Sequence, residues 1–190
     1  MNKIFFHLLL FILLLFLGLF LVPSIMGAAP DPLAHWDFED GSGTNVSDVS
    51  GNGYHGTVNG AVWVAGKYGN ALSFDGINDH VNAGSSSAFD NMPRFTAAAW
   101  IYPYTEGENG KGNIISKSIG GEGQGWIFGF AEGRVNALEV GIDYSGKNIY
   151  KISSDNKLTL NVWQHVAFTW NGTNTPQSVH LYINGVESSY

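Results

Sequence analysis

The sequence contains no cysteine, so neither a disulfide bond nor a lipid-modified cysteine anchor can form. Stability must therefore come from a hydrophobic core or from a bound metal. Positive charge is also scarce: 9 Lys and Arg stand against 16 Asp and Glu, which gives a net charge of −7. An acidic surface argues against nucleic acid and anionic lipid as partners. It is compatible with neutral sugars and with calcium.

The N-terminal segment differs from the rest of the chain. Lys3 is followed by the uncharged run Ile4–Val22, then by Pro23 and the small residues Gly27–Ala29. This order is typical of a secretory signal peptide. The apolar run is also long enough for an uncleaved membrane anchor, which would be the chain's only membrane contact. Residues 1–29 are therefore a signal peptide or an anchor, residues 30–190 form one domain, and this domain is secreted or displayed at the cell surface.

Long helices are not expected in residues 30–190, because glycine is frequent there, with 25 in the whole chain. Short apolar runs between turn clusters are instead typical of an all-β sandwich or barrel. The predicted strands are Leu33–Glu39, His55–Val58, Ala61–Val64, Ala71–Phe74, Asp79–Ala83, Phe95–Tyr102, Asn113–Lys117, Gly125–Ala131, Arg134–Ile142, Lys147–Ser153, Val162–Trp170 and Val179–Ile183.

Alternation along these runs predicts which side chains face the core. In the run that starts at Val162, alternate positions as far as Trp170 share one face. We expect Trp36, Trp100 and Phe168 to be core residues. Asn184–Gly185 predicts a type I′ hairpin turn, because both central residues of that turn need positive φ. The chain ends at Tyr190 within the returning strand, which predicts a sequence that is incomplete at its C-terminal end.

Several motifs in this order resemble a laminin-G-like domain of the concanavalin A-like lectin/glucanase superfamily. The stretch Trp36–Val81 contains WDFEDGSG, DVSGNGYHG and GNALSFDGINDHV. It is followed by FTAAAWIYP at Phe95–Pro103, NVWQHVAFTWNG at Asn161–Gly172 and VHLYINGVES at Val179–Ser188. The resemblance implies two antiparallel sheets packed as a jelly-roll sandwich. It also implies a closing strand, absent from this sequence, that pairs near the first strand.

Some proteins with this fold are β-glucanases, which carry paired carboxylates at alternate positions of one strand. The nearest pair here is Glu139 and Asp143, which share a strand face. Four residues of strand separate them by about 13 Å, which exceeds the roughly 5–9.5 Å of glycosidase pairs. We therefore expect no catalytic residues and no enzymatic activity.

Calcium is the expected cofactor. It needs about six to eight oxygens from carboxylates, amide side chains and carbonyls on bent loops. Asp48 and Asn52 flank glycines in the DVSGNG turn, and Asp75 and Asp79 lie on a later turn. These residues are the predicted ligands, and the resemblance implies a structural calcium near such loops. The alternative is that Asp48 and Asn52 only make turn hydrogen bonds.

Sugar binding needs exposed aromatic rings beside polar groups. Aromatic and polar residues in or near loops are the predicted ligand-binding residues: Trp126, Tyr104, Tyr144, Tyr150, Asn109 and Gln124. The sequence thus predicts a non-catalytic extracellular recognition module that binds glycan or a cell-surface protein. Two alternatives stay open: a structural or adhesion sandwich that contacts protein, and an accessory domain of an exported glycoside hydrolase.

Overall fold

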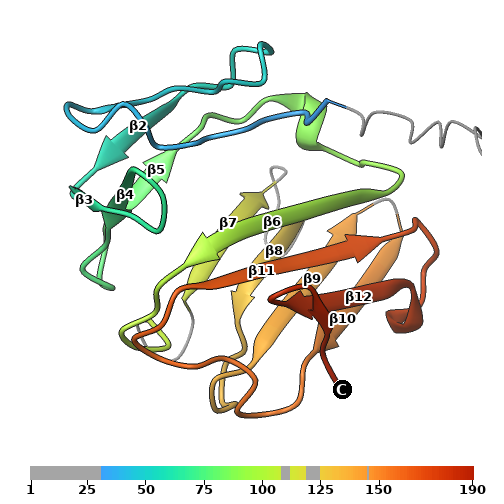
Figure 1. The fold of residues 1–190 in the computed structure, drawn as a ribbon. Helices are drawn as coiled ribbons and strands as arrows, with labels where there is room; N and C mark the ends of the chain where they lie inside the picture. Colours follow the sequence, from blue (N-terminus) through green and yellow to red (C-terminus); the bar gives the residue numbers. More distant parts are fainter. Residues whose placement is uncertain (1–30, 108–111, 119–124, 145) are drawn as a thin grey trace, which may run out of the picture. The chain divides into compact units, whose positions relative to one another are not determined.

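The computed structural model describes residues 31–107, 112–118, 125–144 and 146–190, with the backbone alone described at Ser118 and Tyr144. The part from Pro32 to Tyr190 is one compact unit (Figure 1). The predicted leader, residues 1–29, lies outside the described residues. Among the residues that are described, no helix has the length and apolar character to cross a membrane.

Two four-stranded antiparallel sheets make up most of this unit. The first, here called the β11 sheet, has the order β13-β12-β11-β6 and consists of β6 (Phe95–Ile101), β11 (Gln164–Trp170), β12 (Val179–Ile183) and β13 (Val186–Glu187). The second, the β9 sheet, has the order β10-β9-β8-β7 and consists of β7 (Asn113–Ser118), β8 (Gly125–Phe130), β9 (Leu138–Tyr144) and β10 (Lys147–Ile152). The prediction of an all-β antiparallel sandwich is confirmed.

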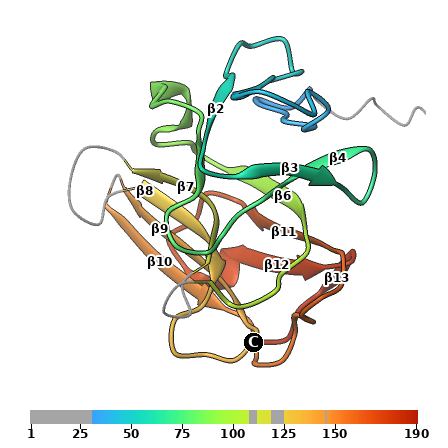
Figure 2. The same ribbon diagram turned by 90° about the vertical axis from the view of Figure 1, so that its left-hand side faces the viewer.

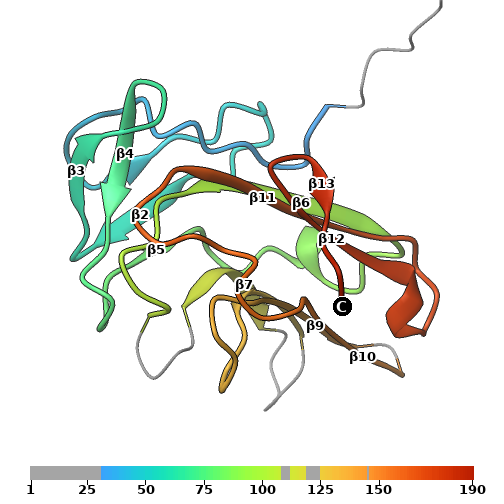
Figure 3. The same ribbon diagram turned by 60° about the horizontal axis from the view of Figure 1, so that its bottom comes forward.

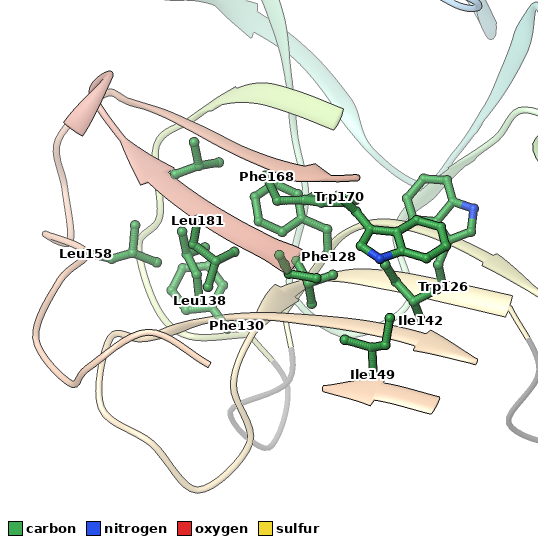
Figure 4. Close-up of a cluster of buried hydrophobic side chains, with 13 residues drawn as sticks. Trp126, Phe128, Phe130, Leu138, Ile142, Ile149, Leu158, Phe168, Trp170 and Leu181 are labelled. Atoms are coloured by element: carbon green, nitrogen blue, oxygen red, sulfur yellow. The ribbon is translucent and has the colours of Figure 1, made fainter. Parts of the chain in front are cut away.

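The main hydrophobic core lies between these two sheets (Figures 3 and 4). Alternate residues of each strand enter it, as the pleat requires. The β9 sheet contributes fully buried Phe128, Leu138 and Val140, and the β11 sheet contributes Phe168 and Leu181, which are equally buried. The prediction for Phe168 is therefore confirmed.

Aromatic rings hold one end of the core together. Phe95 of β6 meets Phe168 at 5.1 Å and Trp170 at 5.8 Å, both on β11, and it meets Trp126 of β8 at 5.0 Å between ring centroids. Tilted and edge-to-face pairs of this kind add about 0.5–1.5 kcal/mol each beyond the area they bury. Phe95 thus joins the two sheets.

The N-terminal third forms two smaller sheets that a two-sheet prediction does not include. The strands β1 (Asn45–Val46), β2 (Gly56–Asn59) and β5 (His80–Asn82) pair in the order β1-β2-β5, and β3 (Val62–Ala65) pairs with β4 (Asn70–Ser73) as a hairpin. A second apolar cluster of Val46, Val58 and Ala61 lies here, with Trp36 and Phe38 packed against it.

The predicted strand Leu33–Glu39 is wrong. Only Trp36 forms a bridge, to Asp48. Phe38 has a φ of 60°, which extended backbone does not allow. The Asp37 carboxylate accepts the amide of Glu39 at 3.2 Å, so the chain turns where the pattern predicted a continuing strand.

One core prediction and one strand limit on the β11 sheet also need correction. Trp100 is 43 % exposed, because the register of β6 with β11 places it beside His165 on the outer face. Val162 is 46 % exposed and precedes β11, which begins at Gln164. Asn161 has a φ of 58°, so the extended backbone starts later than the pattern suggested.

The start of β11 is fixed by a buried amide side chain. Gln164 is 3 % exposed. Its Oε1 accepts the backbone amide of Thr159 at 3.1 Å, and its Nε2 donates to the carbonyl of the same residue at 2.7 Å. The predicted turn Asn184–Gly185 joins β12 to β13. Its φ values are 51° and 78°, which confirms the type I′ prediction.

Replacing Gln164 by Ala should lower the free energy of unfolding by about 2 kcal/mol, because two backbone groups lose a partner. Urea unfolding followed by tryptophan fluorescence measures the change. The exposed Gln177 provides the matched control, and Gln177→Ala should change stability by no more than about 0.5 kcal/mol. Equal effects of the two substitutions would contradict the role given to Gln164.

Candidate functional site

The outer face of the β9 sheet carries the candidate site. Because Phe128, Val140 and Ile149 face the core, the residues between them face outward. These outward positions are Gly125, Ile127 and Gly129 on β8, Glu139, Gly141 and Asp143 on β9, and Asn148, Tyr150 and Ile152 on β10.

Glycines leave this face hollow. Gly125 and Gly141 form part of the lining of a cavity of about 430 Å³. Polar and apolar side chains surround it: Asn113, Ser116, Ile127, Asp143, Asn148 and Tyr150. A sheet face that mixes a ring with hydroxyl, amide and carboxylate groups has the composition of a small-molecule binding site.

Tyr150 lies across the hollow. It pairs with Gly141, which pairs in turn with Ile127, so the three form one row across the sheet. A Cβ atom at Gly141 would lie 3.3 Å from Cε2 of the Tyr150 ring, so the missing side chain makes room for that ring. Tyr150 is still 50 % exposed and offers ring surface to solvent.

The phenol of Tyr150 is held by a buried carboxylate. Its hydroxyl donates a hydrogen bond of 2.5 Å to Oε2 of Glu139, which is 6 % exposed. Partial burial of the phenol raises its pKa, and the hydrogen bond and charge of Glu139 raise it further. Tyr150 is therefore a neutral hydrogen-bond donor at physiological pH, and its ring orientation is fixed.

The hollow is acidic. Glu139 and Asp143 both lie on its face of β9, and the charge of Glu132 also acts on Tyr150. The cation that borders the hollow, Lys117, forms an ion pair of 2.8 Å with Asp90. An anionic ligand would be repelled here, whereas neutral hydroxyl groups would find acceptors and donors.

The structure places four of the predicted ligand-binding residues in different surroundings. Tyr150 lines the hollow. Trp126 is also among the residues that line the hollow, but it is 5 % exposed and its Nε1 donates to the carbonyl of Phe89 at 3.3 Å, so little of its ring is open to a ligand. Tyr104 is 64 % exposed but does not line the hollow. Tyr144 ends β9, one residue beyond Asp143, and its side chain is not described.

The remaining predicted residues, Asn109 and Gln124, lie outside the described residues. Sequence reasoning missed Asn113, Asp143 and Asn148 as lining residues. The signal was present, because GWIFGF places Gly125 and Gly129 on one face of its strand and LEVGIDY places Gly141 in the middle of the next strand. Such spacing leaves one sheet face bare, but only strand register shows that these bare positions adjoin.

The geometry at Asp48 does not fit a calcium ligand. Its Oδ1 accepts the amides of His35 and Ser50, and its Oδ2 accepts the amide of Tyr54 and the hydroxyl of Ser50, each at 2.9 Å. A carboxylate has about four acceptor sites, so this one is fully used. Burial alone would raise its pKa, but the four hydrogen bonds outweigh burial and hold the pKa well below its usual range.

Asn52 and the later turn are also held by internal hydrogen bonds. Asn52 donates from Nδ2 to the carbonyl of Leu33 at 3.0 Å. Asp75 accepts the amide of Ile77 at 2.8 Å, and Asp79 accepts the amide of Asp75 at 2.9 Å. Within the described ranges, no three His, Cys, Asp or Glu residues are grouped to hold a metal. Calcium at the turn of Asp75 and Asp79 stays a prediction.

Two packed antiparallel sheets with a hollowed outer face define an all-β sandwich domain. Residues 74–189 match the family described as the concanavalin A-like lectin/glucanases superfamily. The match covers more than half of the chain, so the chain belongs to this superfamily, as the sequence motifs predicted. No curated protein and no solved structure matches the chain.

Asp48→Asn should destabilise the protein by about 2 kcal/mol at pH 7, because hydrogen bonds to a charged acceptor are lost. The folded-state pKa of Asp48 is depressed, so its contribution is present above the unfolded pKa of about 3.9 and is lost as pH falls below it. The difference between wild type and variant should therefore shrink between pH 5 and pH 2 in urea unfolding.

The control for this pH series is Asp143→Asn, the same substitution on the open sheet face. It should change stability by no more than about 0.5 kcal/mol at pH 7. A wild-type to Asp48→Asn difference that persists undiminished at pH 2 would show that the carboxylate charge is not responsible.

Adding a chelator can show which of the two turns with predicted calcium ligands, that of Asp48 or that of Asp75, binds the ion. Because the Asp48 carboxylate is saturated by protein donors, any change in melting midpoint on adding EDTA should be the same in wild type and in Asp48→Asn. If the turn of Asp75 and Asp79 binds calcium, the shift in melting midpoint on adding EDTA should disappear in Asp75→Asn. Differential scanning calorimetry measures the melting midpoint. An EDTA effect that Asp48→Asn alone abolishes would show that Asp48 is a calcium ligand.

Proposed function

We propose that this domain is a non-catalytic extracellular recognition module that binds neutral carbohydrate in the hollow of the β9 sheet. One observation carries the proposal: the half-exposed ring of Tyr150 lies over Gly141 beside the polar side chains of Asp143 and Asn148. Sugars present C–H faces that stack on rings and hydroxyl groups that need donors and acceptors. The hollow offers both within one cavity.

The charge of the hollow supports a neutral ligand. The carboxylates of Glu139 and Asp143 lie on its face without a basic residue between them on β9. A sugar acid would meet this negative charge directly, and its desolvation would cost binding free energy. Hydroxyl groups of a neutral hexose can instead donate to Asp143 and accept from Asn148.

The proposal of a non-catalytic role rests on the same two acids. A glycosidase needs one carboxyl group free to transfer a proton and a second one on the opposite side of the scissile bond. Glu139 is buried and already accepts the Tyr150 hydroxyl. Four residues of strand separate it from Asp143, or about 13 Å.

The superfamily's description covers both lectins and glucanases, and the predicted leader supports an extracellular location. The alternatives are protein adhesion and an accessory role beside an exported hydrolase. A glycan array of the purified chain separates them. Protein binding without any glycan signal would favour adhesion, and release of reducing sugar would favour catalysis.

Tyr150→Ala should weaken binding of the best neutral glycan at least tenfold, or about 1.4 kcal/mol, because the stacking ring is lost. Tyr150→Phe keeps the ring and should retain most of the affinity. Isothermal titration calorimetry measures both. Tyr104→Ala removes a more exposed tyrosine outside the hollow and should leave the affinity unchanged. Full binding by Tyr150→Ala would place the glycan elsewhere.

A further inference from the structure

A second surface, on the outer face of the β11 sheet, presents exposed rings that the hollow does not include. Trp100 of β6 is 43 % exposed, and Tyr68 of the β3–β4 turn is 70 % exposed. Their ring centroids lie 5.8 Å apart at an interplanar angle of 83°. The ring centroid of His165 on β11 lies 5.4 Å from that of Trp100. We call these residues, together with Lys67, the Trp100 surface.

A cation lies close to both rings. The Nζ atom of Lys67 is 5.5 Å from the centroid of Trp100 and 5.9 Å from that of Tyr68. Within the part of the chain that the structure describes, no carboxylate is paired with this ammonium group. Lys67 is exposed, so its charge is available to a ligand that also contacts the rings.

The stretch Trp36–Val81 fixes this arrangement. The amide of Gly66 donates to the carbonyl of Gly69 at 2.9 Å and closes the β3–β4 turn. Oε1 of Glu39 accepts the amide of Asn70 at 3.1 Å, so its carboxylate holds the end of the same turn. The turn thereby presents Lys67 and Tyr68 beside β6 (Figure 2).

We propose that the Trp100 surface binds an anionic saccharide whose uronate carboxylate meets Lys67 while its ring stacks on Trp100 and Tyr68. The occupant is assigned by charge complementarity. A purely apolar partner would bury the ammonium group without compensation, and a neutral sugar would gain nothing from it. A long polyanion such as nucleic acid is disfavoured by the net charge of −7. The site is separate from the acidic hollow and does not depend on it.

The test uses the full chain and three tetrasaccharide probes in isothermal titration calorimetry: oligogalacturonate, its methyl ester and cellotetraose. The acid and its ester share one ring and differ in charge. Oligogalacturonate should bind at least fivefold more tightly than the ester, and its affinity should fall as NaCl is raised from 50 to 500 mM, because exposed charges are screened. Equal affinity for acid and ester would overturn the proposal.

Variants assign the binding to this surface. Lys67→Gln should weaken oligogalacturonate binding at least fivefold and remove most of its salt dependence, and Trp100→Ala should weaken it at least tenfold. The matched control is Lys147→Gln, whose ammonium lies 5.0 Å from the ring of Trp170, a tryptophan only 2 % exposed. This control should bind normally. Circular dichroism confirms that Trp100→Ala is folded, and Lys67→Gln gives an independent answer if it is not.

The outcomes of the two proposals are distinguishable. Tyr150→Ala should leave oligogalacturonate binding intact, and Lys67→Gln should leave neutral glycan binding intact. Loss of uronate binding in Tyr150→Ala, or an equal loss in Lys147→Gln, would overturn the assignment to the Trp100 surface. Absence of oligogalacturonate binding at millimolar concentration would also overturn it, whatever the result for the hollow.

Discussion

The contact of Phe95 with Trp126, Phe168 and Trp170 is the interaction on which the rest of this structure depends. It joins β6 and β11 of one sheet to β8 of the other, and with no cysteine in the chain no covalent link can replace it. Packing rather than cross-linking must then offset the conformational entropy of ordering the chain. Because alternate residues of each strand are committed to this core, only the positions between them are free to face solvent. Both candidate binding surfaces consist largely of such intervening residues.

Carboxylates serve a different purpose in the N-terminal third. The pKa of Asp40 is lowered by hydrogen bonds from the side chain and amide of Ser47, and that of Asp75 by the amide of Ile77. These acids accept backbone amides that turns would otherwise leave without partners. The stretch Trp36–Val81 is rich in acidic residues because their carboxylates stabilise its turns. Asp48, with its four donors, is the extreme case, and the same saturation that stabilises its turn makes it unsuitable for calcium.

Much of the fold could be predicted from the sequence, because hydrophobic alternation and turn residues act locally. The limits of β6, β8 and β12 and the Asn184–Gly185 turn follow from such patterns. Local patterns could not predict that the Trp100 side chain lies on the outer face of its sheet. In FTAAAWI both alternating sets contain a large apolar residue, and pairing with β11, 63 or more residues later in the chain, decides which set is buried. The burial of Trp126 could be predicted better from its alternation with Phe128 and Phe130 than from its nearness to a loop, although Trp126 does line the hollow. The candidate hollow needed the register of separate strands, which no local pattern contains.

The two surfaces differ in charge because they are built from different parts of the chain. The hollow lies on consecutive strands of one sheet, where glycines expose the backbone and Glu139 and Asp143 supply negative charge. The Trp100 surface needs two distant segments: β6 supplies the indole, and the β3–β4 turn supplies Lys67. Glu39 holds that turn through Asn70, so the stretch Trp36–Val81 positions the ammonium group of Lys67. A sandwich whose interior is used for packing can therefore present two outer faces of opposite charge, the acidic hollow and the Trp100 surface with its Lys67 ammonium group.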